Sequence, residues 1–263
     1  MSNAEKALSI EGLSIAFGGL KAVDDLSFHV NHGEVYGLIG PNGAGKTTAF
    51  NCMTQFYKPD SGKVIFNTLD GRDVDLVGKQ THDIIKLGLV RTFQNVELIQ
   101  DLTLIDNLLV GAHISYTTGL FANAFKLPKA RREEQEMTVK ALDILRFLGI
   151  ESKAYELAGG QPYGVLKKVE LGRTLMGGAK LIILDEPAAG LNDTETTELA
   201  KLIRQIRDEY QCTVLLVEHD MRLVMDICDR ICAISFGKKL AEGTPKEIQE
   251  NKDVQEAYLG KED

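Results

Sequence analysis

An eight-residue segment, GPNGAGKT at positions 40–47, constrains what this chain can fold into more than any other part of the sequence. It fits the pattern G-x-x-x-x-G-K-[ST] in full, between an apolar run at 35–39 and a stretch of helical character at 46–54. Glycines let the backbone curl so that successive N–H groups point at one anion, and the following helix presents its positive end to the same place. The segment therefore predicts a phosphate-binding loop, or P-loop.

The residue types of the P-loop also predict how a nucleotide is held. Lys46 is expected to reach the β- and γ-phosphates, and the Thr47 hydroxyl is expected to bind Mg²⁺. Thr48 is placed to add a hydrogen bond to the α-phosphate. The expected nucleotide-binding residues of this segment are Asn42, Gly43, Ala44, Gly45, Lys46, Thr47 and Thr48.

A second apolar run, Leu181–Leu184, ends in the two carboxylates Asp185 and Glu186. Such a run is typical of a parallel strand buried on both faces, and open α/β sheets bind ligands at the carboxyl ends of their strands. We expect Asp185 to hold Mg²⁺ through water and Glu186 to polarise the attacking water as a general base. Taken alone, the run could equally be a buried strand that ends in an exposed acidic turn, but the P-loop favours the functional interpretation.

The order of apolar patterns predicts the fold class. Short β-rich runs alternate with segments of helical period, which indicates an α/β fold with a largely parallel sheet. Strand signals fade between about 94 and 176, and a capping-box start at Thr103 and Asp106 opens a helical stretch there. We therefore expect one domain, in which residues 1–93 and 177–263 form the core and residues 94–176 form an inserted helical subdomain.

Composition excludes several other classes of protein. The chain has 263 residues and a formal net charge of −8, which argues against broad nucleic-acid binding. Its four cysteines are too few and too scattered for a disulfide scaffold, so we expect reduced thiols. We see no signal peptide and no run of about 18 apolar residues, so any role at a membrane is expected to pass through a partner.

These motifs, in this order, resemble those of the ATP-binding cassette (ABC) ATPases over essentially the whole chain. The resemblance implies a P-loop NTPase core with a helical subdomain, an antiparallel β region, and ATP with Mg²⁺ as cofactors. Gln94 is similar to the family's glutamine that contacts Mg²⁺ and the attacking water, and His219 to the switch histidine that contacts the γ-phosphate. Phe17 is similar to the aromatic residue that stacks on adenine, although core packing is an alternative role for it.

The family's signature, close to LSGGQ, departs from its usual form in this chain. Two stretches compete for its place, LAGGQ at 157–161 and QPYGV at 161–165. The family's usual spacing to Asp185 favours the second, followed by a helix at 166–176. In that register Tyr163 and Gly164 would offer backbone N–H groups to the nucleotide of a second subunit, whereas Pro162 replaces the usual serine. We expect this signature to serve a partner's nucleotide less well than a standard one.

Further stretches resemble one subgroup, the LivG-type ATPases of bacterial branched-chain amino acid importers. They are residues 17–23, 107–111, 186–192 and 257–260. The resemblance implies a second ATPase subunit, usually a different chain, together with transmembrane permease subunits and, indirectly, a periplasmic solute-binding protein. It implies a peripheral location on the cytoplasmic face of the inner membrane. ABC ATPases of lipopolysaccharide export or urea import, and soluble ones such as iron–sulfur assembly factors, remain alternatives.

Overall fold

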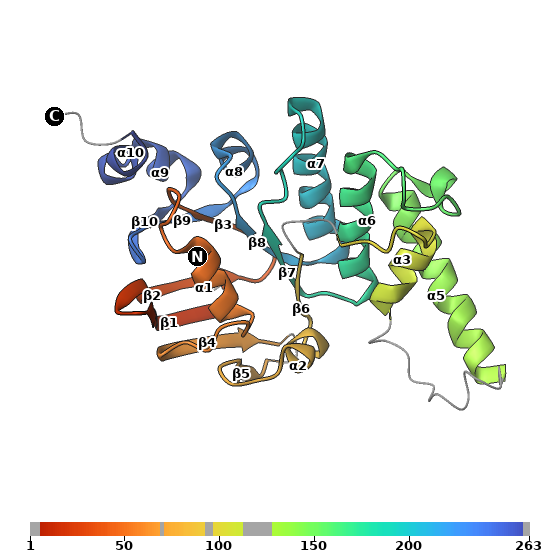
Figure 1. The fold of residues 1–263 in the computed structure, drawn as a ribbon, viewed down its shortest axis with the longest axis horizontal. Coiled ribbons are helices and arrows are strands. Elements are labelled where there is room, and N and C mark those ends of the chain that lie inside the picture. The colour runs from red at the N-terminus through yellow and green to blue at the C-terminus, as the bar shows by residue number, and fades with distance from the viewer. Residues whose placement is uncertain (1–5, 69–70, 93–96, 113–127, 260–263) are drawn as a thin grey trace. The chain divides into compact units, whose positions relative to one another are not determined.

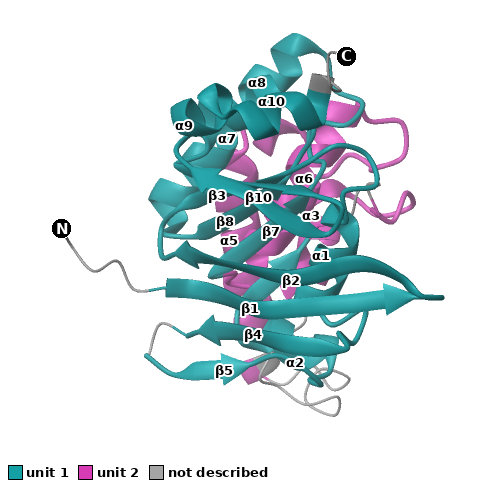
Figure 2. Cartoon of the chain, turned by 90° about the vertical axis from the view of Figure 1, so that its left-hand side faces the viewer, with its two compact units in different colours: residues 1–91, 180–263 teal, residues 92–179 magenta. Residues whose placement is uncertain are grey.

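The computed structural model describes residues 6–68, 71–92, 97–112 and 128–259 (Figure 1). The chain forms two compact units (Figure 2). Unit 1 comprises residues 1–91 and 180–263, and unit 2 comprises residues 92–179. The fold is a mixed α/β fold, as the sequence predicts.

The centre of unit 1 is a mostly parallel sheet with the strand order β10-β9-β3-β8-β7-β6 among the described residues. Neighbouring strands from β6 to β9 are parallel, and β10 pairs antiparallel with β9. Every residue of β3, β7 and β8 is buried, which explains their continuous apolar sequences. The strands are β3 (Val35–Ile39), β6 (Leu89–Arg91), β7 (Leu181–Asp185), β8 (Thr213–Val217), β9 (Arg230–Ser235) and β10 (Lys238–Gly243).

An antiparallel sheet with the order β2-β1-β4-β5 forms a second layer of unit 1. Its strands are β1 (Lys6–Phe17), β2 (Leu20–Asn31), β4 (Ser61–Asn67) and β5 (Asp73–Asp75). One buried apolar cluster combines side chains of this sheet, such as Phe28 and Phe66, with Tyr36 of β3 and Phe50 of the helix after the P-loop. This part of the core of unit 1 therefore joins the two sheets and includes Ala44 of the P-loop.

The helices of unit 1 lie on both faces of the parallel sheet. Helices α7 to α10 cover one face, and α1 lies on the face that also carries the antiparallel sheet (Figures 1 and 2). They are α1 (Lys46–Met53), α2 (Thr81–Lys86), α7 (Asp193–Tyr210), α8 (Met221–Ile227), α9 (Pro245–Glu250) and α10 (Lys252–Leu259). Helix α9 starts with a capping box formed by Thr244 and Glu247. No helix in the described ranges has the length and apolarity that a membrane crossing requires.

Unit 2 is helical in its described residues. It contains α3 (Leu104–Gly111), α5 (Pro128–Phe147), the short 3₁₀ helix η2 (Glu151–Lys153) and α6 (Tyr163–Met176). Thr103 caps α3, and its side chain accepts a hydrogen bond from the backbone N–H of Asp106, as predicted. Helix α6 begins at Tyr163 with Pro162 as its N-cap, three residues earlier than the expected start at 166.

Candidate nucleotide-binding site

The P-loop connects the end of β3 to the start of α1, and its backbone requires glycine. Gly45 is the N-cap of α1 and has a φ of 100°, in the left-handed region that other residues avoid. A Cβ atom at Gly45 would lie 2.3 Å from the carbonyl oxygen of Ala22 in β2. At Gly40, a Cβ would lie 2.4 Å from the carbonyl oxygen of Ile234 in β9. The loop is therefore held between two strands that leave no space for side chains at these positions.

Lys46 directs its ammonium group across the P-loop. The Nζ atom donates hydrogen bonds to the carbonyl oxygens of Gly40, at 2.6 Å, and of Pro41, at 3.2 Å. Burial lowers the pKa of Lys46, while the carboxylates of Glu186, Glu218 and Asp185 oppose that shift. Three carboxylates at the carboxyl ends of β7 and β8 thus lie within electrostatic reach of the lysine that we expect to bind phosphate.

A pocket of about 420 Å³ brings the P-loop together with residues from distant parts of the sequence. All seven expected nucleotide-binding residues at 42–48 line it, and so does the expected general base Glu186. Leu20, Lys21 and Ala22 of β2 form another wall, together with Phe236 from the β9–β10 turn. The structure therefore unites two motifs that the sequence separates widely.

Asp185 lies at the carboxyl end of β7, and Arg91 of β6 is its ion-pair partner. The Nη2 atom of Arg91 lies 3.3 Å from Oδ2 of Asp185, and both side chains are largely buried. Burial raises the pKa of Asp185, Arg91 lowers it, and the nearby carboxylates of Glu186 and Glu218 raise it further. The guanidinium also donates to Asn51 and lies over the ring of Phe50, so α1 fixes its position.

Glu186 and His219 stand at the ends of neighbouring strands, β7 and β8. Glu186 has a φ of 45°, a left-handed conformation that is uncommon for a residue with a side chain and is typical of functional sites. His219 Nδ1 lies 3.8 Å from Oε1 of Glu186. The imidazole is 58% exposed and the glutamate 23% exposed, so both groups are accessible to a bound substrate.

Glu218, between β8 and His219, is the most deeply buried carboxylate of the site, and the sequence analysis did not select it. Its side chain is fully buried and accepts hydrogen bonds from the backbone N–H groups of Ala188, His219 and Asp220. The sequence signal that could have found Glu218 is a carboxylate directly after the apolar run 214–217. Arg91 was missed as well, because a single arginine beside a short strand carries no pattern of its own.

The donor set suits a magnesium ion. The Thr47 hydroxyl and the Asp185 carboxylate are oxygen ligands, which Mg²⁺ prefers, and that ion commonly takes one or two protein ligands and completes its shell with phosphate and water. In the described part of the chain, no group of three or more His, Cys, Asp or Glu side chains is arranged to hold a metal unaided. The residues fit an ion that is held jointly with a nucleotide.

The remaining predicted site residues either do not line this pocket or lie outside the described residues. Phe17 ends β1 and is 47% exposed, so it is not a core residue, and its ring packs edge-on against Tyr57 at a centroid distance of 5.4 Å. Gln94 lies outside the described residues. Tyr163 and Gly164 are the first two residues of α6 in unit 2. Their roles toward a nucleotide stay predictions.

Comparisons with known proteins agree with one another along the chain. The sequence model of the ABC transporter family matches residues 23–189, and that of the branched-chain amino acid ATP-binding cassette transporter family matches residues 238–263. The chain is 44% identical to the Escherichia coli high-affinity branched-chain amino acid transport ATP-binding protein LivG over 98% of this chain and 99% of the relative. It is 45% identical to BraF of Pseudomonas aeruginosa, described in the same terms, over 96% of this chain and 97% of the relative.

Solved structures give the same result. An ATP-binding cassette of an ABC transporter in its ADP conformation superposes with a TM-score of 0.82 at 33% identity, covering 97% of this chain and 99% of that one. A nucleotide-free cassette superposes with a TM-score of 0.81 at 32% identity, covering 97% of this chain and 100% of the other.

Proposed function

The chain belongs to the ABC transporter family of ATPases, and on that premise we propose that it powers a transporter of branched-chain amino acids as one of its ATP-hydrolysing subunits. The observation that carries the proposal is the pocket that joins P-loop residues 42–47 to Glu186. The end-to-end similarity to LivG and BraF supports the choice of solute.

Phosphate binding follows from the P-loop. Its backbone N–H groups and the positive end of α1 attract the phosphates of ATP. The Lys46 ammonium can exchange the carbonyl oxygens of Gly40 and Pro41 for phosphate oxygens by rotating its side chain. Because a phosphate oxygen is charged, the new hydrogen bonds are stronger than those to the neutral carbonyls.

Hydrolysis requires a group that takes a proton from water, and Glu186 is placed to do so. It lies at the pocket wall, is partly exposed and has His219 within 3.8 Å. We assign His219 to the γ-phosphate and Gln94 to the attacking water. A magnesium ion held by Thr47, Asp185 and Gln94 would neutralise charge on the phosphates.

The partner assignment rests on the open side of the pocket and on α6. Two subunits arranged head to tail would place each P-loop opposite the other's signature. The N–H groups of Tyr163 and Gly164 belong to the first turn of α6, where backbone donors have no partner inside the helix. Pro162 supplies no side-chain oxygen at the N-cap. We propose a partner ATPase chain, permease subunits, an indirect periplasmic binding protein, and a peripheral position on the cytoplasmic face of the membrane.

Binding of a fluorescent ATP analogue and release of phosphate test the proposal. Lys46→Ala should weaken binding at least about tenfold, because it removes charge-assisted hydrogen bonds. Glu186→Gln should retain binding and lose about 100-fold or more in hydrolysis, because it removes the general base. Lys246→Ala, which changes an 83% exposed lysine of α9, is the matched control. Wild-type protein that fails to bind ATP, or Glu186→Gln that hydrolyses it at the wild-type rate, would refute the assignment.

Sedimentation of Glu186→Gln with Mg-ATP tests the partner. A dimer formed by this chain alone would show that self-pairing is feasible despite Pro162. A dimer formed only in the presence of a second ATPase chain would support a heterodimer.

Uptake of a radiolabelled branched-chain amino acid into vesicles that contain the permease subunits then tests the solute. Uptake that is unchanged by Lys46→Ala would exclude the proposal that this chain powers the transport.

A further inference from the structure

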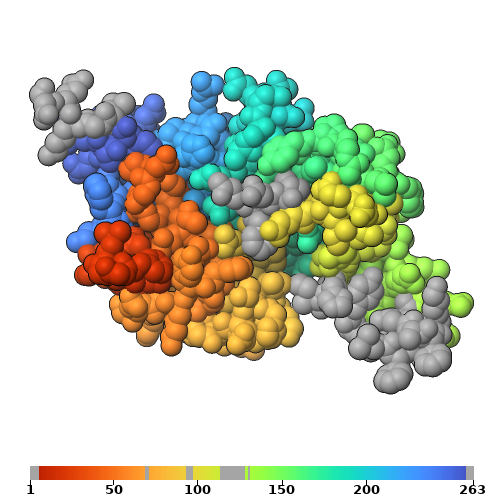
Figure 3. Space-filling view, viewed as in Figure 1, coloured from red at the N-terminus to blue at the C-terminus, as the bar shows by residue number. Residues whose placement is uncertain are grey.

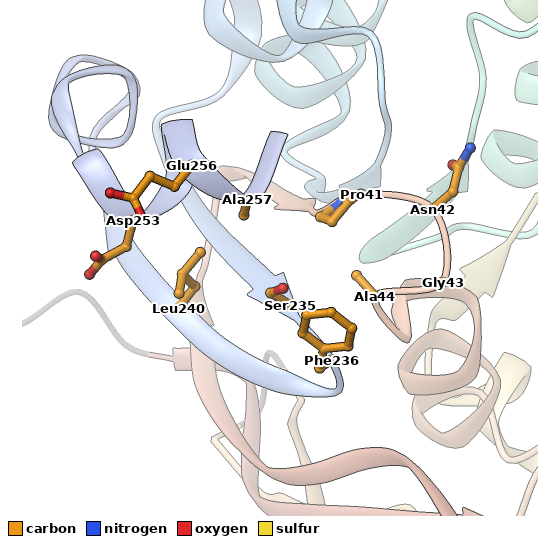
Figure 4. Close-up of a pocket in the computed structure, with 10 residues that line it drawn as sticks. All are labelled: Pro41, Asn42, Gly43, Ala44, Ser235, Phe236, Leu240, Asp253, Glu256 and Ala257. Atoms are coloured by element: carbon orange, nitrogen blue, oxygen red, sulfur yellow. The ribbon is translucent and has the colours of Figure 1, made fainter. Parts of the chain in front are cut away.

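The C-terminal helix α10 lies beside the P-loop, although more than 200 residues separate them in the sequence. The blue C-terminal segment adjoins the orange segment that carries the P-loop in Figures 1 and 3. A cavity of about 560 Å³ lies between them, with P-loop residues 41–44 on one side and Asp253, Glu256 and Ala257 of α10 on the other (Figure 4). This cavity shares Asn42, Gly43, Ala44 and Phe236 with the pocket assigned to the nucleotide.

Tyr258 of α10 reaches the first residue of the P-loop. Its hydroxyl is shielded from solvent and makes no hydrogen bond of regular geometry with another described residue. The backbone N–H of Gly40 lies near enough to the hydroxyl to influence its pKa. Burial raises the pKa of Tyr258 to about 12, while the Gly40 N–H lowers it, so the phenol stays protonated at neutral pH.

Gly40 links this hydroxyl to the phosphate-binding lysine. Its N–H lies near the Tyr258 hydroxyl, and its carbonyl oxygen accepts the 2.6 Å hydrogen bond from Lys46. Gly40 itself is packed closely against β9, since a Cβ atom at this position would meet the Ile234 carbonyl oxygen at 2.4 Å.

We propose that Tyr258 is a positioning residue for ATP binding, one that fixes the backbone of Gly40 at the start of the P-loop once phosphate is bound. A buried hydroxyl without a well-formed hydrogen bond destabilises the protein in which it sits. Hydrogen bonds at active sites are often poorly aligned without substrate and tighten in the complex. When phosphate draws Lys46 away from the Gly40 carbonyl, the Gly40 N–H is free to align with the Tyr258 oxygen, so ATP binding completes this bond. The inference rests on the proposed ATP binding.

Tyr258→Phe tests this role because it removes the hydroxyl and retains the ring. We expect ATP affinity to fall about two- to tenfold, the range for one lost hydrogen bond, with KM rising and kcat nearly unchanged. The melting temperature without nucleotide should stay the same or rise, since an incompletely bonded buried hydroxyl is gone. Tyr258→Ala should lower both the ATP affinity and the melting temperature, because it also removes the packing of the ring.

The two readouts separate a positioning role from a structural one. A purely structural tyrosine would lower ATP affinity and melting temperature together in Tyr258→Phe, and that result overturns the proposal. Unchanged ATP affinity in Tyr258→Phe also overturns the proposal. Tyr155→Phe, at a tyrosine that is 72% exposed, is the control, and an equal loss of ATP affinity in that variant overturns the proposal as well. Wild-type protein that binds no ATP would refute the proposed function itself, and the inference with it.

Discussion

Replacing Arg91 with methionine should destabilise the protein in a pH-dependent way. The guanidinium pairs with Asp185 at 3.3 Å, donates to Asn51 at 2.7 Å and lies over the ring of Phe50. Methionine has a similar length and keeps the apolar contact with Phe50. The substitution therefore leaves Asp185 as a buried carboxylate without its cation.

The burial of the pair sets the magnitude. The side chains of Arg91 and Asp185 are 14% and 6% exposed. Breaking a buried pair by removing one partner costs about 3–5 kcal/mol, and we take the lower end because the arginine retains some contact with solvent. A loss of about 3 kcal/mol lowers the melting temperature of a protein of this size by roughly 6–12 °C.

The pH dependence follows from Asp185. Burial already raises its pKa above the unfolded value, and loss of the opposing Arg91 charge raises it further. A carboxyl whose pKa is higher in the folded state stabilises the fold less as pH rises, because the unfolded state binds fewer protons there. Between the folded pKa values of wild type and variant, the cost of the substitution should therefore grow by up to about 1.4 kcal/mol per pH unit.

Urea unfolding at steps between pH 4 and pH 8, followed by far-UV circular dichroism, measures both effects. Tryptophan fluorescence offers no signal because the chain contains no tryptophan. Arg132→Met is the control, since it breaks an ion pair whose arginine is 83% exposed and should cost less than about 1 kcal/mol. A cost for Arg91→Met that is the same at every pH in this range would refute the reasoning, as would an additive result in the double variant with Asp185→Asn.

Two further predictions concern the P-loop and the signature. Gly45→Ala should abolish binding of the ATP analogue, because its Cβ atom would meet the Ala22 carbonyl oxygen at 2.3 Å. Gly43→Ala should weaken binding only through the strain of its positive φ, because no atom lies within 4 Å of a Cβ at that position. Equal binding by the two variants would contradict this account. Pro162→Ser places a hydroxyl at the N-cap of α6 and should raise ATP turnover of the assembled transporter; unchanged turnover would show that the proline does not weaken the site.

The parts of the fold that were predictable are those that local sequence specifies. Strands β3, β7 and β8 are buried on both faces, so their composition alone identifies them. The P-loop is equally local, because eight consecutive residues contain both the glycines and the lysine that its geometry needs. Placing Glu186 in the same pocket needed only the rule that parallel strands end at one edge of the sheet.

The long β1–β2 hairpin shows why a strand can be harder to find. Its two strands alternate buried and exposed residues, but several register shifts interrupt the pairing. Gly12 and Asp25 adopt positive φ values within the strands, at 59° and 55°. Each irregularity moves the following side chains to the other face, so a simple period of two does not persist along the sequence.

Glu218 shows most clearly what sequence motifs leave out. Sequence reasoning selected Glu186 and His219 but not the side chain that links their backbone segments. Glu218 accepts hydrogen bonds from the backbone N–H groups of Ala188, two residues after Glu186, and of His219 itself. One buried carboxylate thus binds the segments that carry the proposed base and the proposed switch histidine. Motif residues identify the chemistry of the site. The positions of those residues depend on Glu218, whose importance shows only when the segments after β7 and β8 are seen together.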